Sequence, residues 1–331
     1  MVLKRSLVQV FGLLLLLCAS PALAESDHDR AEALFQKGYT LYQQRYGAVA
    51  ITPLEKAAKL GHAEAAYWVG EILRKRYTYM TEEAEQFYHQ AAEGGEVYAM
   101  LRMGQKGNMC GTLRDCDDDR EEWLERAKDL VLPKAEAGDA QAMMAVSLAF
   151  GNLGDLDKEF EWVKWAAENG HAFAQYWLAT GLLGDQGMGF YWTDEGRRED
   201  IIKWLKASAE QGFPKAILKL AGEYREDGRF EDANEWVDRM GKTDYFDALY
   251  NYGLILLDGP DGMYRYPEAK PVEGLAVLLA IYRERGSSAV KRSIDRRTPD
   301  LSPEVIAEAE KRSEELLVDT PIIYYLPKFG M

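Results

Sequence analysis

The residues of this sequence that could carry out chemistry form incomplete catalytic motifs. Ser288 and Lys291 have the Ser-x-x-Lys spacing in which a lysine activates a serine nucleophile, but the companion motifs of that chemistry are not evident. Gly241-Lys242-Thr243 lacks the upstream glycine that a phosphate-binding loop needs. We therefore expect a protein that is not an enzyme and that carries no cofactor.

The four histidines do not form a catalytic or metal-binding cluster in the sequence. His62 and His171 occupy the same position after a glycine in two similar segments, whereas His28 and His89 lie apart from them. Because this position recurs, the pattern predicts a structural role for the first two histidines. No metal site is predicted.

The N-terminal segment has the features of a secretory signal peptide. A basic start precedes an apolar stretch at residues 11–18, and Ala22-Leu23-Ala24 is typical of a cleavage site. An uncleaved anchor is disfavoured, since the apolar stretch is about half the roughly 20 residues that span a bilayer. Lipidation at Cys18 is disfavoured because Leu17 stands where a small residue is usual. The sequence predicts cleavage after residue 24, a periplasmic location and no transmembrane segment in the mature protein.

Export changes what the two remaining cysteines imply. Cys110 and Cys116 lie close together, with no histidine beside them, which falls short of a zinc ligand set. In an oxidising compartment two such thiols are expected to form a disulfide. A loop this short would contribute roughly 2 kcal/mol, so the bond would be a local staple.

Composition excludes some partners and favours others. The chain has 331 residues, 47% of them hydrophobic, and a formal net charge of −15. Removal of residues 1–24 would take away two basic residues and leave −17. Nucleic acid is an unfavourable partner for so acidic a chain. A protein with a basic surface would be attracted to it.

Internal repeats organise most of the sequence. Similar segments place an alanine in the same register at Ala65, Ala99, Ala142, Ala174, Ala216, Ala248 and, more loosely, Ala289. The intervals alternate between short and long, at 34, 43, 32, 42, 32 and 41 residues. Each segment reads as a helix, a glycine stop and a second helix, with the clearest stops at Gly61, Gly138, Gly170 and Gly212. Such helix pairs bury their apolar faces by stacking on one another.

The repeat pattern resembles the Sel-one-like repeat family, a relative of the tetratricopeptide repeats, over roughly residues 30–290. The resemblance implies an all-α fold, a right-handed α-solenoid of about seven helix-turn-helix repeats in a single domain from residue 25 to 331. It also implies a capping helix at about 302–318. Ser302 is a suitable N-cap for that helix, and Pro303 suits its first turn.

Three inserted loops, at about 104–118, 184–197 and 258–271, account for the long repeats. Connections of this kind emerge on one edge of a solenoid. Aromatic and methionine side chains on such loops typically anchor protein interfaces. The alternative is that they fold back and fill gaps between repeats. The aromatic and methionine residues of these loops and of the shorter first loop are Tyr77, Tyr79, Met80, Phe190, Tyr191, Trp192, Met263, Tyr264 and Tyr266.

An acidic run lies beside the two cysteines and includes Asp117, Asp118 and Asp119. Its spacing lacks the glycine and the distal glutamate of a calcium loop. A solvated helix start explains the run. We also predict that these carboxylates contribute to binding a basic partner.

Two kinds of binding function remain open. The signal peptide, acidic array and inserted loops resemble periplasmic immunity proteins that neutralise type VI secretion effectors, especially phospholipase D-type lipases. The alternative is an envelope scaffold for polysaccharide or cell-wall assemblies. Some family members are associated with β-lactams, but this chain lacks their regular cysteine pairs, so a β-lactam-hydrolysing activity is not inferred.

Overall fold

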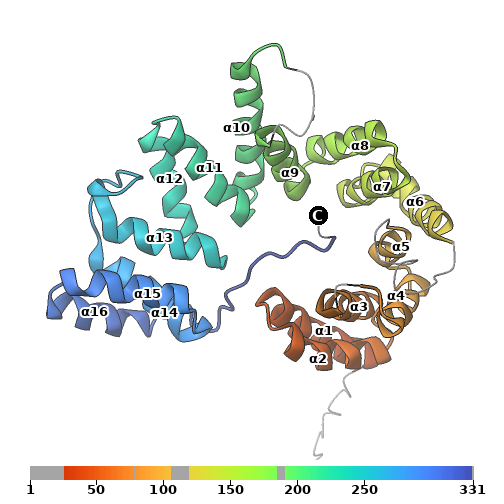
Figure 1. Ribbon diagram of the computed structural model, residues 1–331, viewed down its shortest axis with the longest axis horizontal. Helices are drawn as coiled ribbons and strands as arrows, with labels where there is room; N and C mark the ends of the chain where they lie inside the picture. The colour runs from red at the N-terminus through yellow and green to blue at the C-terminus, as the bar shows by residue number, and fades with distance from the viewer. Residues whose placement is uncertain (1–25, 78, 106–118, 185–190, 330–331) are drawn as a thin grey trace, which may run out of the picture.

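The computed structural model describes residues 26–77, 79–105, 119–184 and 191–329. These residues fold into helices that follow one another around a ring, which confirms the predicted all-α solenoid (Figure 1). The first half contains α1 (Asp27–Gln43), α2 (Gly47–Lys59), α3 (Ala63–Tyr77), α4 (Glu82–Glu93), α5 (Val97–Gly104), α6 (Arg120–Glu136), α7 (Ala140–Leu153) and α8 (Leu156–Glu168). The second half contains α9 (Ala172–Leu183), α10 (Asp194–Glu210), α11 (Pro214–Glu226), α12 (Phe230–Met240), α13 (Phe246–Asp258), η1 (Gly259–Asp261), α14 (Pro271–Arg285), α15 (Ser288–Arg297), η2 (Thr298–Asp300) and α16 (Pro303–Ser313).

The helices form antiparallel pairs in two layers. The repeat alanines lie on α3, α5, α7, α9, α11 and α13, which we call the A helices together with α1. Their partners α2, α4, α6, α8, α10, α12 and α14 are the B helices, and the A layer lines the inside of the ring (Figure 1). Each of the six repeat alanines is at most 5% exposed. Small side chains are therefore found where neighbouring helices approach closely.

Glycine ends the B helices, as predicted. Gly170 adopts φ 86°, a left-handed conformation that favours glycine, and its N–H donates to Ala167 O at 3.1 Å. The next N–H, of His171, donates to Ala166 O at 2.9 Å. Gly61, Gly138 and Gly212 have φ values of 90°, 99° and 83°. These turns send the chain directly into the next A helix.

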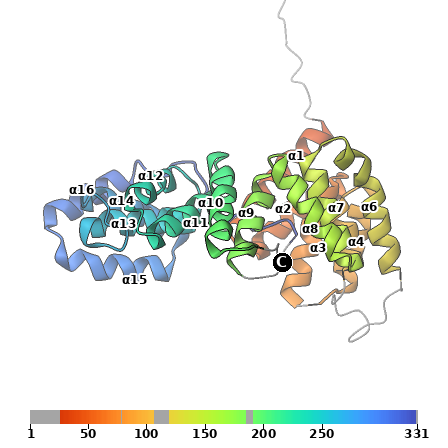
Figure 2. The ribbon, with the colours of Figure 1, turned by 90° about the horizontal axis from the view of Figure 1, so that it is seen from above.

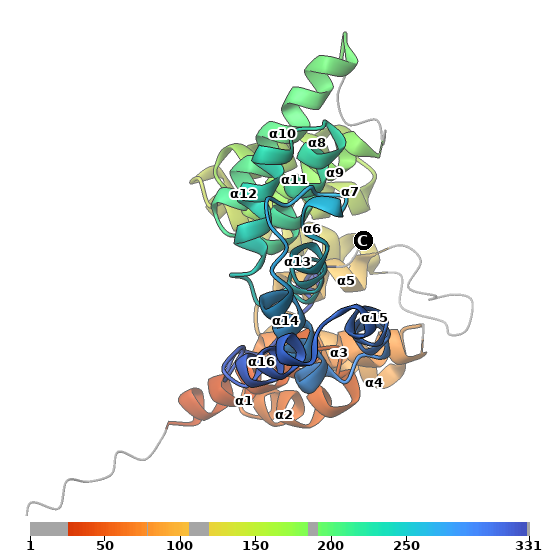
Figure 3. The same cartoon turned by 90° about the vertical axis from the view of Figure 1, so that its left-hand side faces the viewer.

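The connections from A to B helices alternate in length, which explains the alternating repeat intervals. Short connections precede α4, α8 and α12, whereas long ones precede α6, α10 and α14. The second long connection is shorter than predicted, because α10 begins at Asp194 and not near residue 197. The N-cap of α10 is Thr193, whose hydroxyl accepts a hydrogen bond from Gly196 N at 3.1 Å. The first turns of α10 project beyond the neighbouring helices (Figures 1 and 3).

The end of the solenoid is covered by α15 and α16. The Ser302 hydroxyl accepts a hydrogen bond from Val305 N at 3.3 Å, and Pro303 occupies the first turn of α16. The helix ends at Ser313, earlier than the predicted end at about residue 318.

The residues after α16 return through the inside of the ring. Residues 314–329 run from α16 past α13 and α1 toward α3 and α5, as Figures 1 and 2 show. The two ends of the solenoid also meet, because Gln44 Nε2 donates to Glu284 Oε1 at 3.1 Å. Arg285 donates to Gln44 O and lies 4.5 Å from the ring centre of Tyr46. This returning segment and the contact between the ends were not predicted from the sequence.

Among the described residues, no helix is long and apolar enough to cross a membrane. The predicted signal peptide, residues 1–24, lies outside the described residues.

Candidate functional site

Exposed apolar side chains concentrate where A helices connect to B helices, a border that we call the connection edge. Because the A helices run in the same direction, these connections follow one edge of the superhelix. Of the nine large, exposed apolar side chains in the described part of the chain, six lie at or beside such connections. These six are Tyr46, Val49, Tyr77, Leu156, Trp192 and Met263, whereas Leu130, Trp165 and Val318 lie elsewhere. Solvent-facing aromatic and methionine side chains of this kind anchor protein interfaces.

Three residues of the predicted binding set are prominent on this edge. Trp192 is 91% exposed, Met263 is 76% exposed and Tyr77 is 46% exposed. Tyr79 is partly buried, with its ring centre 6.3 Å from that of Tyr77. These residues remain candidates for contact with a partner.

Four other residues of the set are packed into the protein and are corrected here. Met80 is 5% exposed and belongs to the core of the first repeats. Tyr264 and Tyr266 are 8% and 5% exposed and pack with α11 and α12. Tyr191 is partly buried against the core, and its hydroxyl donates to Asp200 Oδ2 at 2.7 Å. For these side chains the gap-filling alternative is the correct one.

Ionisable groups show how firmly the loop tyrosines are held. Tyr266 donates to Asp238 Oδ1 at 2.6 Å. Burial and the neighbouring Asp238 carboxylate raise the pKa of the Tyr266 phenol. Burial and the hydrogen bond to Asp200 raise the pKa of Tyr191 to about 12. Both phenols therefore stay neutral donors and fix the loops that carry Trp192 and Met263.

The segments that carry Trp192 and Met263 are supported by the same end of α11. Arg198, in α10, forms ion pairs with Glu223 and Asp227 at that end. The guanidinium of Arg225, in α11, lies 5.2 Å from the ring centre of Tyr264. The start of α10 and the segment around Tyr264 therefore flank one helix end. Both segments therefore contact α11, and each carries one strongly exposed apolar side chain on the connection edge.

Charged side chains of both signs lie beside Trp192 and Met263: Arg197 pairs with Asp194 at 2.9 Å, and Arg265 and Lys270 are exposed. Carboxylates of Asp194, Glu195, Asp261 and Glu268 are exposed close in sequence to Trp192 or Met263. Asp119, from the predicted acidic set, precedes α6, and its Oδ2 accepts from Trp123 Nε1 at 2.8 Å, as expected at a helix start. Asp117, Asp118, Phe190 and the predicted disulfide pair Cys110 and Cys116 lie outside the described residues.

A second candidate site lies inside the ring, where the returning segment meets the A helices. Lys328 places Nζ 2.9 Å from Glu64 Oε1 and 3.0 Å from Glu96 Oε2. Burial raises the pKa of Glu96, and Lys328 counteracts that effect. Phe329 is 8% exposed, with Arg102 4.2 Å from its ring centre. The segment is therefore recognised through both charge and apolar contact.

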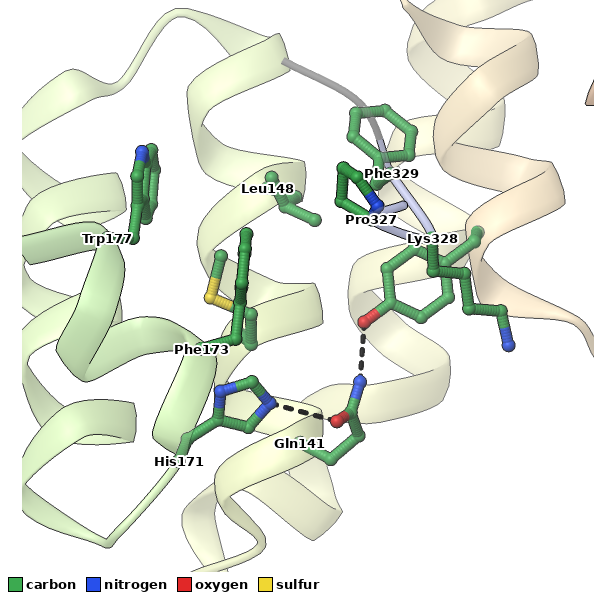
Figure 4. Close-up of a pocket in the computed structure, with 10 residues that line it drawn as sticks. Gln141, Leu148, His171, Phe173, Trp177, Pro327, Lys328 and Phe329 are labelled. Atoms are coloured by element: carbon green, nitrogen blue, oxygen red, sulfur yellow. Dashed lines mark hydrogen bonds between the residues drawn. The ribbon is translucent and has the colours of Figure 1, made fainter. Parts of the chain in front are cut away.

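An apolar cavity of about 170 Å³ adjoins this segment (Figure 4). Its walls come from α5, α7, α9 and the returning segment, and the residues are Tyr98, Gln141, Met144, Leu148, His171, Phe173, Trp177, Pro327, Lys328 and Phe329. Gln141 bridges the rim, since it donates to Tyr98 OH at 2.6 Å and pairs with His171 Nε2 at 2.9 Å. Burial lowers the pKa of His171, which favours a neutral imidazole.

The chemical motifs of the sequence are engaged in structural contacts. His62 and His171 accept from Ala65 N and Ala174 N, each at 3.1 Å, and so cap α3 and α9. Lys291 pairs with Asp295 at 2.7 Å. Among the described residues, no group of three or more histidine, cysteine or acidic side chains is placed to hold a metal ion.

Sequence reasoning missed the inner site. The apolar run Ile322-Ile323-Tyr324-Tyr325-Leu326 after the capping helix was a signal that this segment is not a solvated tail. Several of its partners, such as Gln43, Glu64 and Glu96, lie at the other end of the chain, so no local pattern pointed to them.

No model of a known family and no curated protein matches this chain. Among solved structures, it is similar to a protective antigen of uropathogenic Escherichia coli that displays an SLR fold, at 17% identity and a TM-score of 0.48. That alignment covers 88% of this chain and 62% of the antigen, so the chain spans less than two thirds of the antigen's length.

Two further solved structures have lower scores. A Sel1 repeat protein from Oxalobacter formigenes has 20% identity and a TM-score of 0.37, over 66% of this chain and 89% of its own. An immunity protein from Pseudomonas aeruginosa has 17% identity and a TM-score of 0.37, over 58% of this chain and 69% of its own. These structural neighbours include Sel1-like repeat proteins. That is the repeat type that the sequence resembles.

Proposed function

We propose that this chain is an exported, protein-binding repeat protein that acts as an immunity protein against a type VI secretion effector of the phospholipase type. The connection edge would cover the active site of the effector and block it without any chemistry. The observation that carries the proposal is the concentration of exposed apolar side chains on that edge, with Trp192 91% and Met263 76% exposed.

The chemistry of the edge suits such a target. A phospholipase D-type site must hold a lipid phosphate with basic groups, which form charge-assisted hydrogen bonds. The net charge of the chain, −15, would attract it to a basic mouth and speed the encounter. Trp192 and Met263 would then supply apolar contact at the entrance, where lipid chains otherwise pass. Charge would govern the association rate, and the apolar anchors would govern the lifetime of the complex.

Co-expression in the periplasm tests this function. A phospholipase-type effector encoded beside the gene for this chain is produced with the wild-type chain, with a Trp192→Ala/Met263→Ala variant or with a Trp165→Ala variant. Trp165 is a matched control, because it is 43% exposed and lies in the second half of α8, away from the connection edge. We expect the wild type and the control to protect the cells and the double variant to fail.

Two results would contradict the proposal. One is full protection by the double variant when its circular dichroism spectrum and melting temperature match those of the wild type. The other is a failure of the wild-type chain to protect against the neighbouring effector. A gene neighbourhood made up of polysaccharide or cell-wall synthesis genes would instead favour the scaffold function.

A further inference from the structure

The segment Ile322–Phe329 lies in the inside of the ring as an extended peptide held by its backbone. Ile323 N donates to Asp244 O at 2.9 Å, and Phe246 N donates to Ile323 O at 3.0 Å. Tyr324 N donates to Gln43 O at 3.0 Å, and Leu326 N donates to Gln43 Oε1 at 2.6 Å. Backbone pairing of this kind does not depend on the side chains of the bound segment, so other extended segments can satisfy it.

The side-chain contacts define which segments would fit. Two carboxylates, of Glu64 and Glu96, receive the Lys328 ammonium, which also lies 5.0 Å from the ring centre of Tyr98. Tyr67 donates to the carbonyl oxygen of Lys328. The site therefore selects a lysine at one position of an extended chain.

Apolar surfaces flank the lysine position. Phe329 packs against Arg102 and Tyr98, and its neighbour Pro327 lines the 170 Å³ cavity. Phe173 and Trp177 form part of the opposite wall (Figure 4). The cavity has room for an apolar side chain next to the lysine position.

The segment of this chain is a strained occupant. Tyr325 adopts φ 48°, in the left-handed region that L-residues avoid, and it is held there while its hydroxyl donates to Asp244 Oδ1 at 2.6 Å. The link to α16 is exposed at Val318, Asp319 and Thr320. A segment from another protein would not carry the constraint of this link.

We propose that the inside of the ring is a peptide-binding groove for an extended protein segment that presents a lysine between apolar side chains, and that residues 322–329 occupy it as a tethered competitor. A partner carrying such a segment displaces the tether and is held by the same backbone, carboxylate and cavity contacts. This groove is lined by the A helices, on the inside of the ring, and the B helices form the outside. The inference does not depend on the immunity function.

A cleavable full-length chain tests the groove. A protease site is inserted between Asp319 and Thr320, and binding of a fluorescent peptide with the sequence Pro321–Met331 is followed by anisotropy before and after cleavage. We expect the cleaved chain, after dialysis, to bind the peptide at least about tenfold more tightly than the uncut chain. A Lys328→Glu peptide should bind about tenfold more weakly, as should the wild-type peptide to a Glu64→Gln/Glu96→Gln chain. Glu195→Gln, an exposed site in α10, is the matched control.

Three results would overturn the proposal. The first is that a cleaved chain that keeps its circular dichroism spectrum does not bind the peptide. The second is that cleaved and uncut chains bind it equally tightly, and the third is that the Lys328→Glu peptide binds as tightly as the wild-type peptide. If cleavage unfolds the protein, the binding experiment uses the uncut Lys328→Glu chain in place of the cleaved chain. In that chain the weakened tether should raise peptide binding about tenfold over the wild type, and no gain would refute the competition.

Discussion

Gln43 and Leu326, 283 residues apart in the sequence, pair through two hydrogen bonds inside the ring. Gln43 Nε2 donates to Leu326 O at 2.9 Å, and Leu326 N donates to Gln43 Oε1 at 2.6 Å. The side-chain amide thus presents to the returning segment the donor and acceptor that a neighbouring strand would present. Because Gln43 ends α1, this pair ties the first helix of the solenoid to the last described segment.

Replacing Gln43 by alanine should destabilise the protein. Gln43 is 2% exposed, and its loss leaves the part-buried N–H and C=O of Leu326 without these partners, at a cost of about 1–3 kcal/mol. Urea denaturation followed by circular dichroism measures the effect. Gln36→Ala on the exposed side of the same helix is the control and should change the stability by less than about 0.5 kcal/mol. Equal stability of the two variants would show that the pairing contributes nothing.

The buried carboxylate of Glu71 should make stability depend on pH. Its oxygens accept from Arg102 Nε at 2.6 Å, Tyr88 OH at 2.8 Å and Arg74 at 3.1 Å. Burial alone would raise the pKa of Glu71, but Arg102 and Arg74 outweigh it and hold the pKa below the ordinary value of 4.5. The stabilisation is therefore complete above pH 4.5 and is lost as the pH falls through the lowered folded-state pKa.

Glu71→Gln should accordingly cost about 3 kcal/mol at neutral pH, because it leaves buried guanidinium groups short of a counter-charge. The difference from the wild type should shrink below pH 4.5. Denaturation midpoints between neutral pH and acid check this, with exposed Glu93→Gln as the control. A difference that is constant with pH would argue against the charge network.

Tyr266 and Met263 should respond in opposite ways to substitution. Tyr266→Phe removes the hydrogen bond to Asp238 and should lower the free energy of unfolding by about 1 kcal/mol, with no direct effect on partner binding. Met263→Ala, at a side chain that is 76% exposed, should leave stability within about 0.5 kcal/mol and weaken binding. Thermal denaturation of both variants tests this, and a larger stability loss in Met263→Ala would place that side chain in the core.

A close contact between α13 and α14 requires glycine. A Cβ atom at Gly274 would lie 2.7 Å from the carbonyl oxygen of Gly253, so Gly274→Ala should cost about 1–3 kcal/mol. Gly222, in α11, has room for the extra carbon, and Gly222→Ala should stabilise the chain by up to about 1 kcal/mol. Melting temperatures of the two variants should therefore move in opposite directions. A shift in the same direction would contradict the packing.

The helix pairs were predictable because their signals are local. An alanine at each close approach and a glycine at each stop recur at alternating short and long intervals, and packing requires both. The side of the solenoid that carries the long connections followed from the same register. The start of α10 was missed by a few residues, since Thr193 caps the helix within the segment taken as a loop.

The loop tips were only partly predictable. Met263, Tyr264, Arg265 and Tyr266 alternate between exposed and buried, so every second residue, Tyr264 and Tyr266, faces the core. The alternation of residue types was present in the sequence, but composition alone does not say which set of side chains is buried. The inner site was beyond prediction, because Gln43 and Leu326 come together only when the whole ring has formed.

Site-specific photo-crosslinking tests the central claim, that the connection edge binds a protein, most directly. A benzoylphenylalanine residue replaces Trp192, Met263 or, as the control, Trp165, and cells that carry the neighbouring effector gene are irradiated. We predict that positions 192 and 263 crosslink to the same phospholipase-type effector and that position 165 does not. The absence of an effector adduct at 192 and 263, with the variants folded and the effector present, would contradict the account.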